Sequence, residues 1–183
     1  PPRATAAAPP RRGGRAGQAA HARRGPEPCA RHNPGLMVGL PRTPRDAKGL
    51  LKTAIRDDSP VVFFEDKMGY TIKGEVPEGD YLIPFGEADV KRTGEDITIV
   101  ATSSMVYVAL KAAELLAADG ISAEVIDPRT TVPLDVDTLV LSAKKTSRAI
   151  VVDEGYQSYG ATAEIAARLT EGAFYHLAAT VPR

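Results

Sequence analysis

Residues 97–127 read ITIVATSSMVYVALKAAELLAADGISAEVID, and the spacing of their apolar residues changes twice. The first six residues form an apolar run that is typical of a buried strand. ISAEVID, residues 121–127, reads as a second strand. Between the two strands, apolar side chains recur at helical spacing and end before Gly120, a residue type that often follows a helix; they are Val106, Ala109, Leu110, Ala113, Leu116 and Ala117. A strand, a helix and a strand in this order predict parallel strands in an α/β fold.

The same alternation continues on the C-terminal side. Residues 134–146 (LDVDTLVLSAKKT) predict a helix, and residues 148–154 (RAIVVDE) predict a strand. Residues 161–169 (ATAEIAARL) predict another helix. Strands that alternate with helices favour a mostly parallel sheet that is covered on both faces.

A hairpin is predicted just before residue 97. The segments ADVKR, residues 88–92, and ITIVAT, residues 97–102, flank the turn-forming residues Thr93-Gly-Glu-Asp96. We therefore expect these two strands to pair with each other.

A second folding unit is predicted upstream of a connector. DAKGLLKTAIRD, residues 46–57, has one apolar helical stripe, and PVVFFED, residues 60–66, reads as a buried strand. Residues 67–84 (KMGYTIKGEVPEGDYLIP) are rich in Gly, Pro and charge, which is typical of a connector between two folding units. We place the boundary near Leu82.

The net charge of zero averages two chemically different parts. Residues 1–45 carry nine Arg, one acidic residue and nine of the fifteen prolines, whereas residues 46–183 carry 14 basic and 22 acidic residues. No aromatic residue precedes Phe63, so we expect residues 1–32 to be disordered or poorly packed. A basic tail without interleaved aromatic residues does not favour nucleic-acid binding. The absence of Ser from residues 1–17 argues against a targeting peptide.

Several classes of protein are disfavoured by composition. No apolar run approaches the roughly 20 residues that a membrane-spanning helix needs. Cys29 is the one cysteine, which excludes an internal disulfide and a cysteine-cluster metal site. The three histidines, at positions 21, 32 and 176, do not have the spacing of zinc ligands.

Two segments at helix ends are candidate sites. Ser103 and Ser104 lie where a strand turns into a helix, so their hydroxyls can cap the helix or help to hold a phosphate. We favour capping because no Gly-rich turn precedes them. Residues 54–60 (AIRDDSP) end a helix whose last carbonyls, beside Asp57, could coordinate a cation. A plain helix end explains the same residues.

Three further features are weaker candidates. Asp153 and Glu154 end a predicted strand, where ligands collect in open α/β sheets, but adjacent residues on a strand point to opposite faces. A role in a loop or an interface is favoured over an acid–base pair. Nothing near His32 would orient its ring for catalysis, and His176 lies near the end of the sequence between apolar residues, so neither is favoured as a catalytic residue. DPRTTVPLD, residues 127–135, redirects the chain after a strand and is either an active-site loop or a connector.

Three longer segments carry a family resemblance. Residues 33–70, residues 73–113 and residues 123–135 resemble, in this order, the beta subunit of thiamine-dependent 2-oxo acid dehydrogenases. That family includes the decarboxylating components of the pyruvate, branched-chain 2-oxo acid and acetoin complexes. The resemblance extends from about Asn33 to Arg183.

The resemblance implies a domain order. It identifies residues 33–81 as the end of a thiamine pyrimidine-binding domain plus linker. Residues 82–183 are similar to a transketolase C-terminal-type α/β domain with a mostly parallel sheet. Because the family continues beyond the position of Arg183, we expect this domain to be incomplete and the chain to be truncated at both ends.

The resemblance also implies roles for particular residues. The family's catalytic histidine falls at Ala22, with His21 one position early, while Glu27 and His32 fit the surrounding pattern. The family's potassium ligands fall on four positions, where Ser59 replaces the usual Asn: Ala54, Ile55, Asp57 and Ser59. DPRTTVPLD is implied to be a connector, with Asp135 near a helix N-cap and Arg129 pairing with acidic groups at a subunit contact.

The implied function is oxidative decarboxylation of a 2-oxo acid with acyl transfer to a lipoyl carrier. The resemblance implies thiamine diphosphate and Mg²⁺, bound mainly by other chains or by missing residues, and K⁺. It implies an alpha subunit in a heterotetramer, a lipoyl acyltransferase partner, and a cytoplasmic location or, alternatively, the mitochondrial matrix. The alternative function is a noncatalytic assembly module that retains only the C-terminal α/β domain. A nucleotide-binding domain is disfavoured, because no glycine fingerprint follows a strand.

Overall fold

The computed structural model describes residues 5–8 and 27–183, and these form two compact units. The first unit extends to Gly86 and also includes Arg129–Pro133. The second unit comprises Glu87–Pro128 and Leu134–Arg183. The prediction of disorder over residues 1–32 falls mostly outside the described residues. The boundary near Leu82 stays a prediction, while the chain passes from one unit to the other after Gly86.

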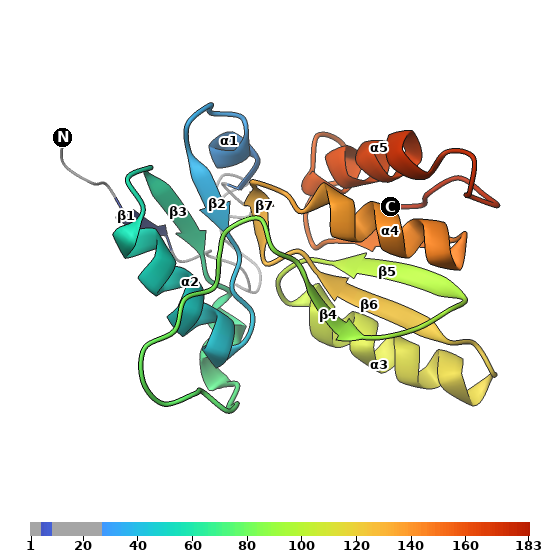
Figure 1. Ribbon diagram of the computed structural model, residues 1–183, viewed down its shortest axis with the longest axis horizontal. Coiled ribbons are helices and arrows are strands. Elements are labelled where there is room, and N and C mark those ends of the chain that lie inside the picture. The colour runs from blue at the N-terminus through green and yellow to red at the C-terminus, as the bar shows by residue number, and fades with distance from the viewer. Residues whose placement is uncertain (1–4, 9–26) are drawn as a thin grey trace, which may run out of the picture. The chain divides into compact units, whose positions relative to one another are not determined.

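The first unit is built on a four-stranded sheet in the order β1-β3-β2-β7. The strands β1 (Thr5–Ala8), β3 (Val61–Phe64) and β2 (Met37–Gly39) are parallel, and β7 (Thr130–Val132) is antiparallel to β2. Helix α2 (Pro44–Arg56) covers one face, and the short helix α1 (Glu27–Arg31) lies on the other (Figure 1). The 3₁₀ helix η2 (Lys67–Thr71) follows β3.

Burial in the first unit follows the alternation of its strands. Val61 and Phe63 of β3 pack with Leu50 and Ala54 of α2, whereas Phe64 packs on the opposite face with Val38 and Leu40. Leu50, Val61 and Phe63 are each no more than 2% exposed, so the apolar stripe of α2 is its buried face.

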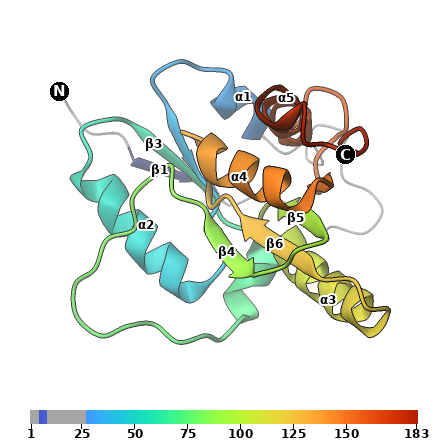
Figure 2. The same ribbon diagram turned by 45° about the vertical axis from the view of Figure 1, so that its right-hand side comes forward.

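The second unit has a sheet in the order β4-β6-β5-β8. Strands β6 (Ala123–Asp127), β5 (Ile97–Ala101) and β8 (Ala149–Val152) are parallel, and β4 (Asp89–Arg92) is an antiparallel edge. Helix α3 (Met105–Ala118) packs on one face. Helices α4 (Val136–Thr146) and α5 (Ala161–Ala173) pack on the other (Figure 2). This arrangement confirms the α/β fold with a mostly parallel sheet.

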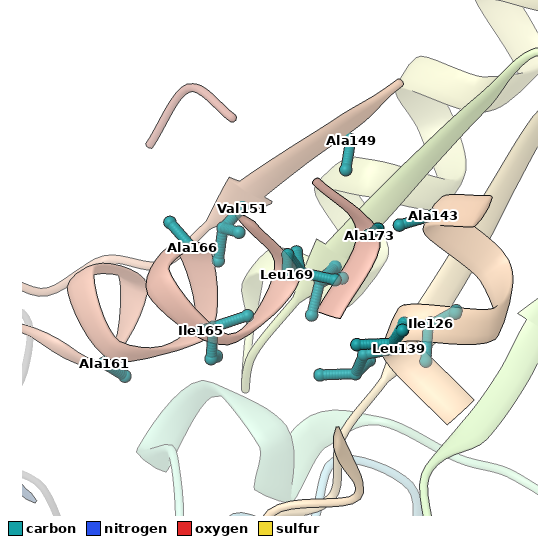
Figure 3. Packing of buried hydrophobic residues seen from close by; sticks show 12 residues of the cluster. Ile126, Leu139, Ala143, Ala149, Val151, Ala161, Ile165, Ala166, Leu169 and Ala173 are labelled. Carbon is teal, nitrogen blue, oxygen red and sulfur yellow. The ribbon is translucent and has the colours of Figure 1, made fainter. Parts of the chain in front are cut away.

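Apolar side chains of α4 and α5 pack against those of the sheet in one hydrophobic core. Leu139 of α4 and Ile165 and Leu169 of α5 point toward Ile126 and Val151 of the strands (Figure 3). Each of these five side chains is at most 2% exposed. The close packing accounts for the apolar periodicity of both helices.

The predicted hairpin between residues 88–92 and 97–102 is wrong. Strand β4 pairs with β6, and β5 lies on the far side of β6. The turn between β4 and β5 passes over the start of β6, where Glu95 and Asp96 donate backbone hydrogen bonds to the carbonyl of Ser122. Gly94 has no Cβ to prevent this approach, because a Cβ there would lie 2.2 Å from the carbonyl carbon of Ala123.

Helix boundaries follow local capping. Thr43 is the N-cap of α2, and its side chain accepts a hydrogen bond from the Asp46 N–H, so α2 begins before the predicted Asp46. Asp135 caps α4 by accepting from the Thr138 N–H at 3.1 Å, which confirms its predicted place near the N-cap.

Within the described part of the chain, no helix combines the length and apolar character needed to cross a membrane.

Candidate functional site

The segment 127–135 is more than a connector in the structure. After β6 ends at Asp127, residues 130–132 form β7 and add a strand to the sheet of the first unit. Thr130 is fully buried; its hydroxyl accepts a hydrogen bond from the Gly86 N–H at 3.0 Å and donates to the Pro133 carbonyl at 2.8 Å. These contacts make residues 129–133 part of the first unit, so the segment that connects β6 to α4 also contributes a strand to the first sheet.

Arg129 pairs within the chain. Its Nη1 lies 3.5 Å from Oδ1 of Asp46, and the two side chains are 11% and 2% exposed. Asp46 also accepts a hydrogen bond from the Thr43 hydroxyl at 2.6 Å. The resemblance implied that Arg129 pairs with an acidic group at a subunit contact, whereas the acidic partner in the structure is Asp46 of the same unit.

The four predicted cation ligands lie together at the C-terminal end of α2. Ala54 is buried in the last turn, and Ile55 and Ser59 are exposed. Asp57 is the C-cap; its N–H donates to the Thr53 carbonyl, and its Oδ1 accepts from the Ser59 N–H at 2.7 Å. The end of the helix therefore brings backbone carbonyls and one carboxylate to a single turn, where the helix dipole favours positive charge.

An exposed ion-pair cluster lies on the same helix. Asp80 accepts hydrogen bonds from Nζ of Lys52 at 2.6 Å and from Nη2 of Arg56 at 2.7 Å. These two hydrogen bonds lower the pKa of Asp80 to about 2. The cluster ties the connector after η2 to the last two turns of α2 and places two cationic side chains there.

Ser104 does not cap α3 with its side chain. It is the N-cap residue, but its side chain makes no capping hydrogen bond, so the capping prediction is wrong for Ser104. The Met105 N–H donates to the Thr102 carbonyl, and the Val106 N–H donates to the Ser103 carbonyl. A backbone turn with Ser103 at φ 51° therefore satisfies the first helical N–H groups. Because these two N–H groups already donate to backbone carbonyls, they do not favour a phosphate site at this helix end.

The strand-end carboxylates and two of the histidines lie just after helices or strands. Asp153 follows β8 and is half-buried, while Glu154 is exposed. His32 follows α1, His176 follows α5, and both are exposed. The residues around the family's catalytic histidine position, His21 and Ala22, lie outside the described residues. Glu27, in α1, is buried.

Comparison with known proteins identifies the family. The family model described as "Transketolase, C-terminal domain" matches residues 86–183, which is more than half of the chain. The chain belongs to this family. Its match covers all of the second unit, so the unit with β5, β6 and β8 is the transketolase C-terminal domain.

The similarity to known proteins extends beyond the transketolase C-terminal domain to most of the chain. The 2-oxoisovalerate dehydrogenase subunit beta of Bacillus subtilis is 48% identical over 153 residues, covering 83% of this chain and 47% of the relative. The pyruvate dehydrogenase E1 component subunit beta of the same organism is 50% identical over 151 residues, covering 82% and 46%. The resemblance to such beta subunits is thereby confirmed, and the chain spans about half the length of these relatives.

A solved structure agrees with this assignment. A chain described as "Split gene transketolase, inactive beta4 tetramer" matches with a TM-score of 0.68 and 27% identity, covering 85% of this chain and 49% of that one. The mitochondrial pyruvate dehydrogenase E1 component subunit beta of Pisum sativum is 47% identical over 154 residues, covering 82% of this chain and 43% of the relative.

A buried polar network inside the transketolase C-terminal domain was missed by sequence reasoning. Glu124 of β6 is 4% exposed and accepts hydrogen bonds from the Ser142 hydroxyl and the Lys145 ammonium of α4. Burial raises the pKa of Glu124, but these donors together with the Gly94 N–H outweigh burial and lower the pKa. Glu124 therefore stays charged at neutral pH. The signal in the sequence was an acidic residue between the apolar residues Ala123 and Val125 of a predicted strand, and the network is structural.

Proposed function

We propose that this chain is part of the beta subunit of a 2-oxo acid dehydrogenase decarboxylating component. The observation that carries the proposal is the identity of 48–50% over at least 82% of the chain to beta subunits of the 2-oxoisovalerate and pyruvate enzymes. The reaction is oxidative decarboxylation of a 2-oxo acid, with transfer of the acyl group to a lipoyl carrier. An acetoin oxidoreductase subunit beta is 49% identical, so overall identity does not select the substrate.

The proposed cofactor is thiamine diphosphate with Mg²⁺. Thiamine supplies a carbanion when it is bound, and the protein supplies orientation. The described residues do not fit the metal–diphosphate part, because they contain no group of three or more His, Cys, Asp or Glu side chains that could hold a metal ion. We assign that part to the alpha subunit and derive no catalytic step from the described residues.

The chain's proposed role is therefore to assemble with partners. We propose an alpha subunit in a heterotetramer and a lipoyl acyltransferase as the second partner. We propose the cytoplasm as the location, since several relatives come from bacteria, with the mitochondrial matrix as the alternative suggested by the pea relative.

The alternative function is a noncatalytic assembly module. It is supported by the similar solved structure, whose description names an inactive tetramer of beta chains. Both functions require partner binding, and they differ in whether a partner restores turnover.

Activity of the chain alone tests an expectation that both functions share. We expect no decarboxylation by the purified 183-residue chain with thiamine diphosphate and Mg²⁺, because a half-built site loses the positioning that accounts for most of the rate. The measurement is reduction of 2,6-dichlorophenolindophenol by pyruvate or by 2-oxoisovalerate. Turnover by the chain alone would contradict the proposal that these residues supply only part of a site.

Mixing experiments complete this test. The chain should co-elute with the Bacillus subtilis pyruvate dehydrogenase alpha subunit in gel filtration. Turnover after addition of a separate pyrimidine-binding domain supports the enzymatic function, and stable co-elution without turnover supports the assembly module. If no alpha subunit of the three related enzyme types co-elutes, both functions fail.

We further propose that K⁺ binds at the end of α2, through Ala54, Ile55, Asp57 and Ser59. The support is the position of these four residues at the C-terminus of α2, where Asp57 is the C-cap and the helix end attracts cations. Bound K⁺ should stabilise the first unit by about 1 kcal/mol. Thermal unfolding in KCl and in LiCl measures the effect.

The control for this prediction is the neighbouring carboxylate. Asp57→Ala should abolish the difference between K⁺ and Li⁺, while Asp58→Ala should preserve it. An equal response of the unmodified chain to both salts would show that the effect is general screening.

A further inference from the structure

A cavity lies at the opposite end of α2 from the proposed K⁺ site. It has a volume of about 280 Å³ and is formed where the segments following β2 and β3 lie beside the first turn of α2. β2 and β3 are parallel, and ligands collect at the carboxyl ends of parallel strands in open α/β sheets. Because α2 has 13 residues, its two ends are about 20 Å apart, so the cavity is distinct from the K⁺ site.

The cavity contains a buried ion pair. Nη1 of Arg42 lies 3.3 Å from Oδ2 of Asp66, and the two side chains are 6% and 7% exposed. Gly69 makes room for this pair, because a Cβ at that position would lie 3.2 Å from the same Nη1. The charges of Arg42 and Asp66 cancel, so the charge of a ligand is selected by the other lining groups.

Glu65 adds a further charge to the described lining of the cavity. Its Oε2 accepts a hydrogen bond from the Tyr70 hydroxyl at 2.8 Å. This hydrogen bond to Glu65 raises the pKa of Tyr70, so the phenol stays protonated and remains a donor at neutral pH. The described lining thus carries two carboxylates and one guanidinium, a surplus of one negative charge.

The remaining walls are largely apolar. Besides Thr43, they include Tyr70, Pro41, Pro44, Ala47 and Ile72. Such walls suit a short hydrocarbon chain, and a cation gains further attraction where it meets an aromatic ring. The volume lies just below the lower end of the usual range for small-molecule pockets, about 300 Å³.

We propose that this cavity binds a small organic cation, specifically the ammonium end of a short alkylamine. Its ammonium group contacts Glu65 and its carbon chain lies against the prolines and Ile72. An anion is disfavoured, since it would meet two carboxylates and a guanidinium that is already paired with Asp66. The proposal is independent of the enzymatic function proposed above.

Calorimetric titration of the full chain at pH 7 tests the proposal, with n-butylamine as the probe. Saturable binding of butylammonium is expected, together with binding of n-butanol that is about tenfold weaker, as for loss of one hydrogen bond to a charged group. Sodium butyrate should not compete. Equal affinity for the amine and the alcohol, or no saturable heat with the amine, overturns the proposal.

Two variants locate the binding. Glu65→Gln should weaken butylammonium about tenfold, by the same loss of a charged acceptor. Glu78→Gln is the matched control, because Glu78 is an exposed glutamate of the same unit that does not line the cavity. Equal effects of the two variants would place the amine elsewhere. Ala47→Leu, which fills the cavity, should abolish binding, provided that the variant keeps the circular dichroism spectrum of the unmodified chain.

Discussion

The Arg129→Met variant should lower the free energy of unfolding by about 3–5 kcal/mol, the usual effect of removing one partner from a buried ion pair. The Asp46 carboxylate is 2% exposed and would lose the guanidinium 3.5 Å away. Met retains much of the length of the Arg side chain, so the variant tests charge more than packing. Urea denaturation followed by circular dichroism measures the change.

A second arginine provides the control. Arg168 pairs with Glu164 at 2.8 Å, but both side chains are more than half exposed. Such a surface pair contributes at most about 0.5 kcal/mol, so Arg168→Met should be nearly neutral. Adding Asp46→Asn to Arg129→Met should recover part of the loss, because an amide is less costly to bury than a carboxylate. Similar losses in the two Arg variants would mean that the Arg129–Asp46 pair is not specially important.

The Gly94→Ala variant should destabilise the transketolase C-terminal domain by about 3 kcal/mol. A Cβ at Gly94 would lie 2.2 Å from the carbonyl carbon of Ala123 and 2.3 Å from the Glu124 nitrogen. Both contacts are with the backbone of the central strand β6, so relief requires displacement of the turn before β5. The same displacement removes the Gly94 N–H from Glu124. Thermal unfolding monitored by circular dichroism measures the loss.

Gly155→Ala is the control for this substitution. A Cβ at Gly155 would meet the end of the Asp153 side chain at 3.0 Å, and that side chain can rotate away. The control should therefore shift the midpoint of unfolding little. A loss of stability in Gly155→Ala as large as that in Gly94→Ala would show that flexibility of the chain, rather than the clash with β6, decides the effect.

The local pattern predicted most elements of the fold. The 3.6-residue spacing that ends before Gly120 corresponds to α3, and the apolar runs correspond to β3, β5, β6 and β8. The pairing of β4 could not be predicted in the same way, because the turn residues 93–96 resemble those of a hairpin. What decides the pairing is the close approach of Gly94 to Ala123, a contact between residues distant in the sequence.

The candidate sites also differ in whether neighbouring residues or distant contacts form them. Ala54 to Ser59 are neighbours in sequence, so their gathering at one helix end was predictable from the end of the apolar stripe and from Pro60. The cavity beside Arg42 was not predictable, because Arg42 and Asp66 follow different strands and meet only when β2 and β3 align. Ser104 stands at the expected N-cap position, but its hydroxyl does not accept the first helical N–H groups. The left-handed backbone of Ser103 lets the carbonyls of Thr102 and Ser103 accept them instead.

The pairing of β7 with β2 determines when the first sheet can be completed during synthesis. β2 and β3 leave the ribosome while Thr130–Val132 have yet to be synthesised, so one edge of the first sheet lacks its neighbour during that interval. An unpaired strand edge is a template for association with other chains. A nascent chain that ends at Gly86 also lacks the Arg129 side chain that neutralises Asp46. Completion of the first unit therefore depends on translation through Pro128 of the second unit.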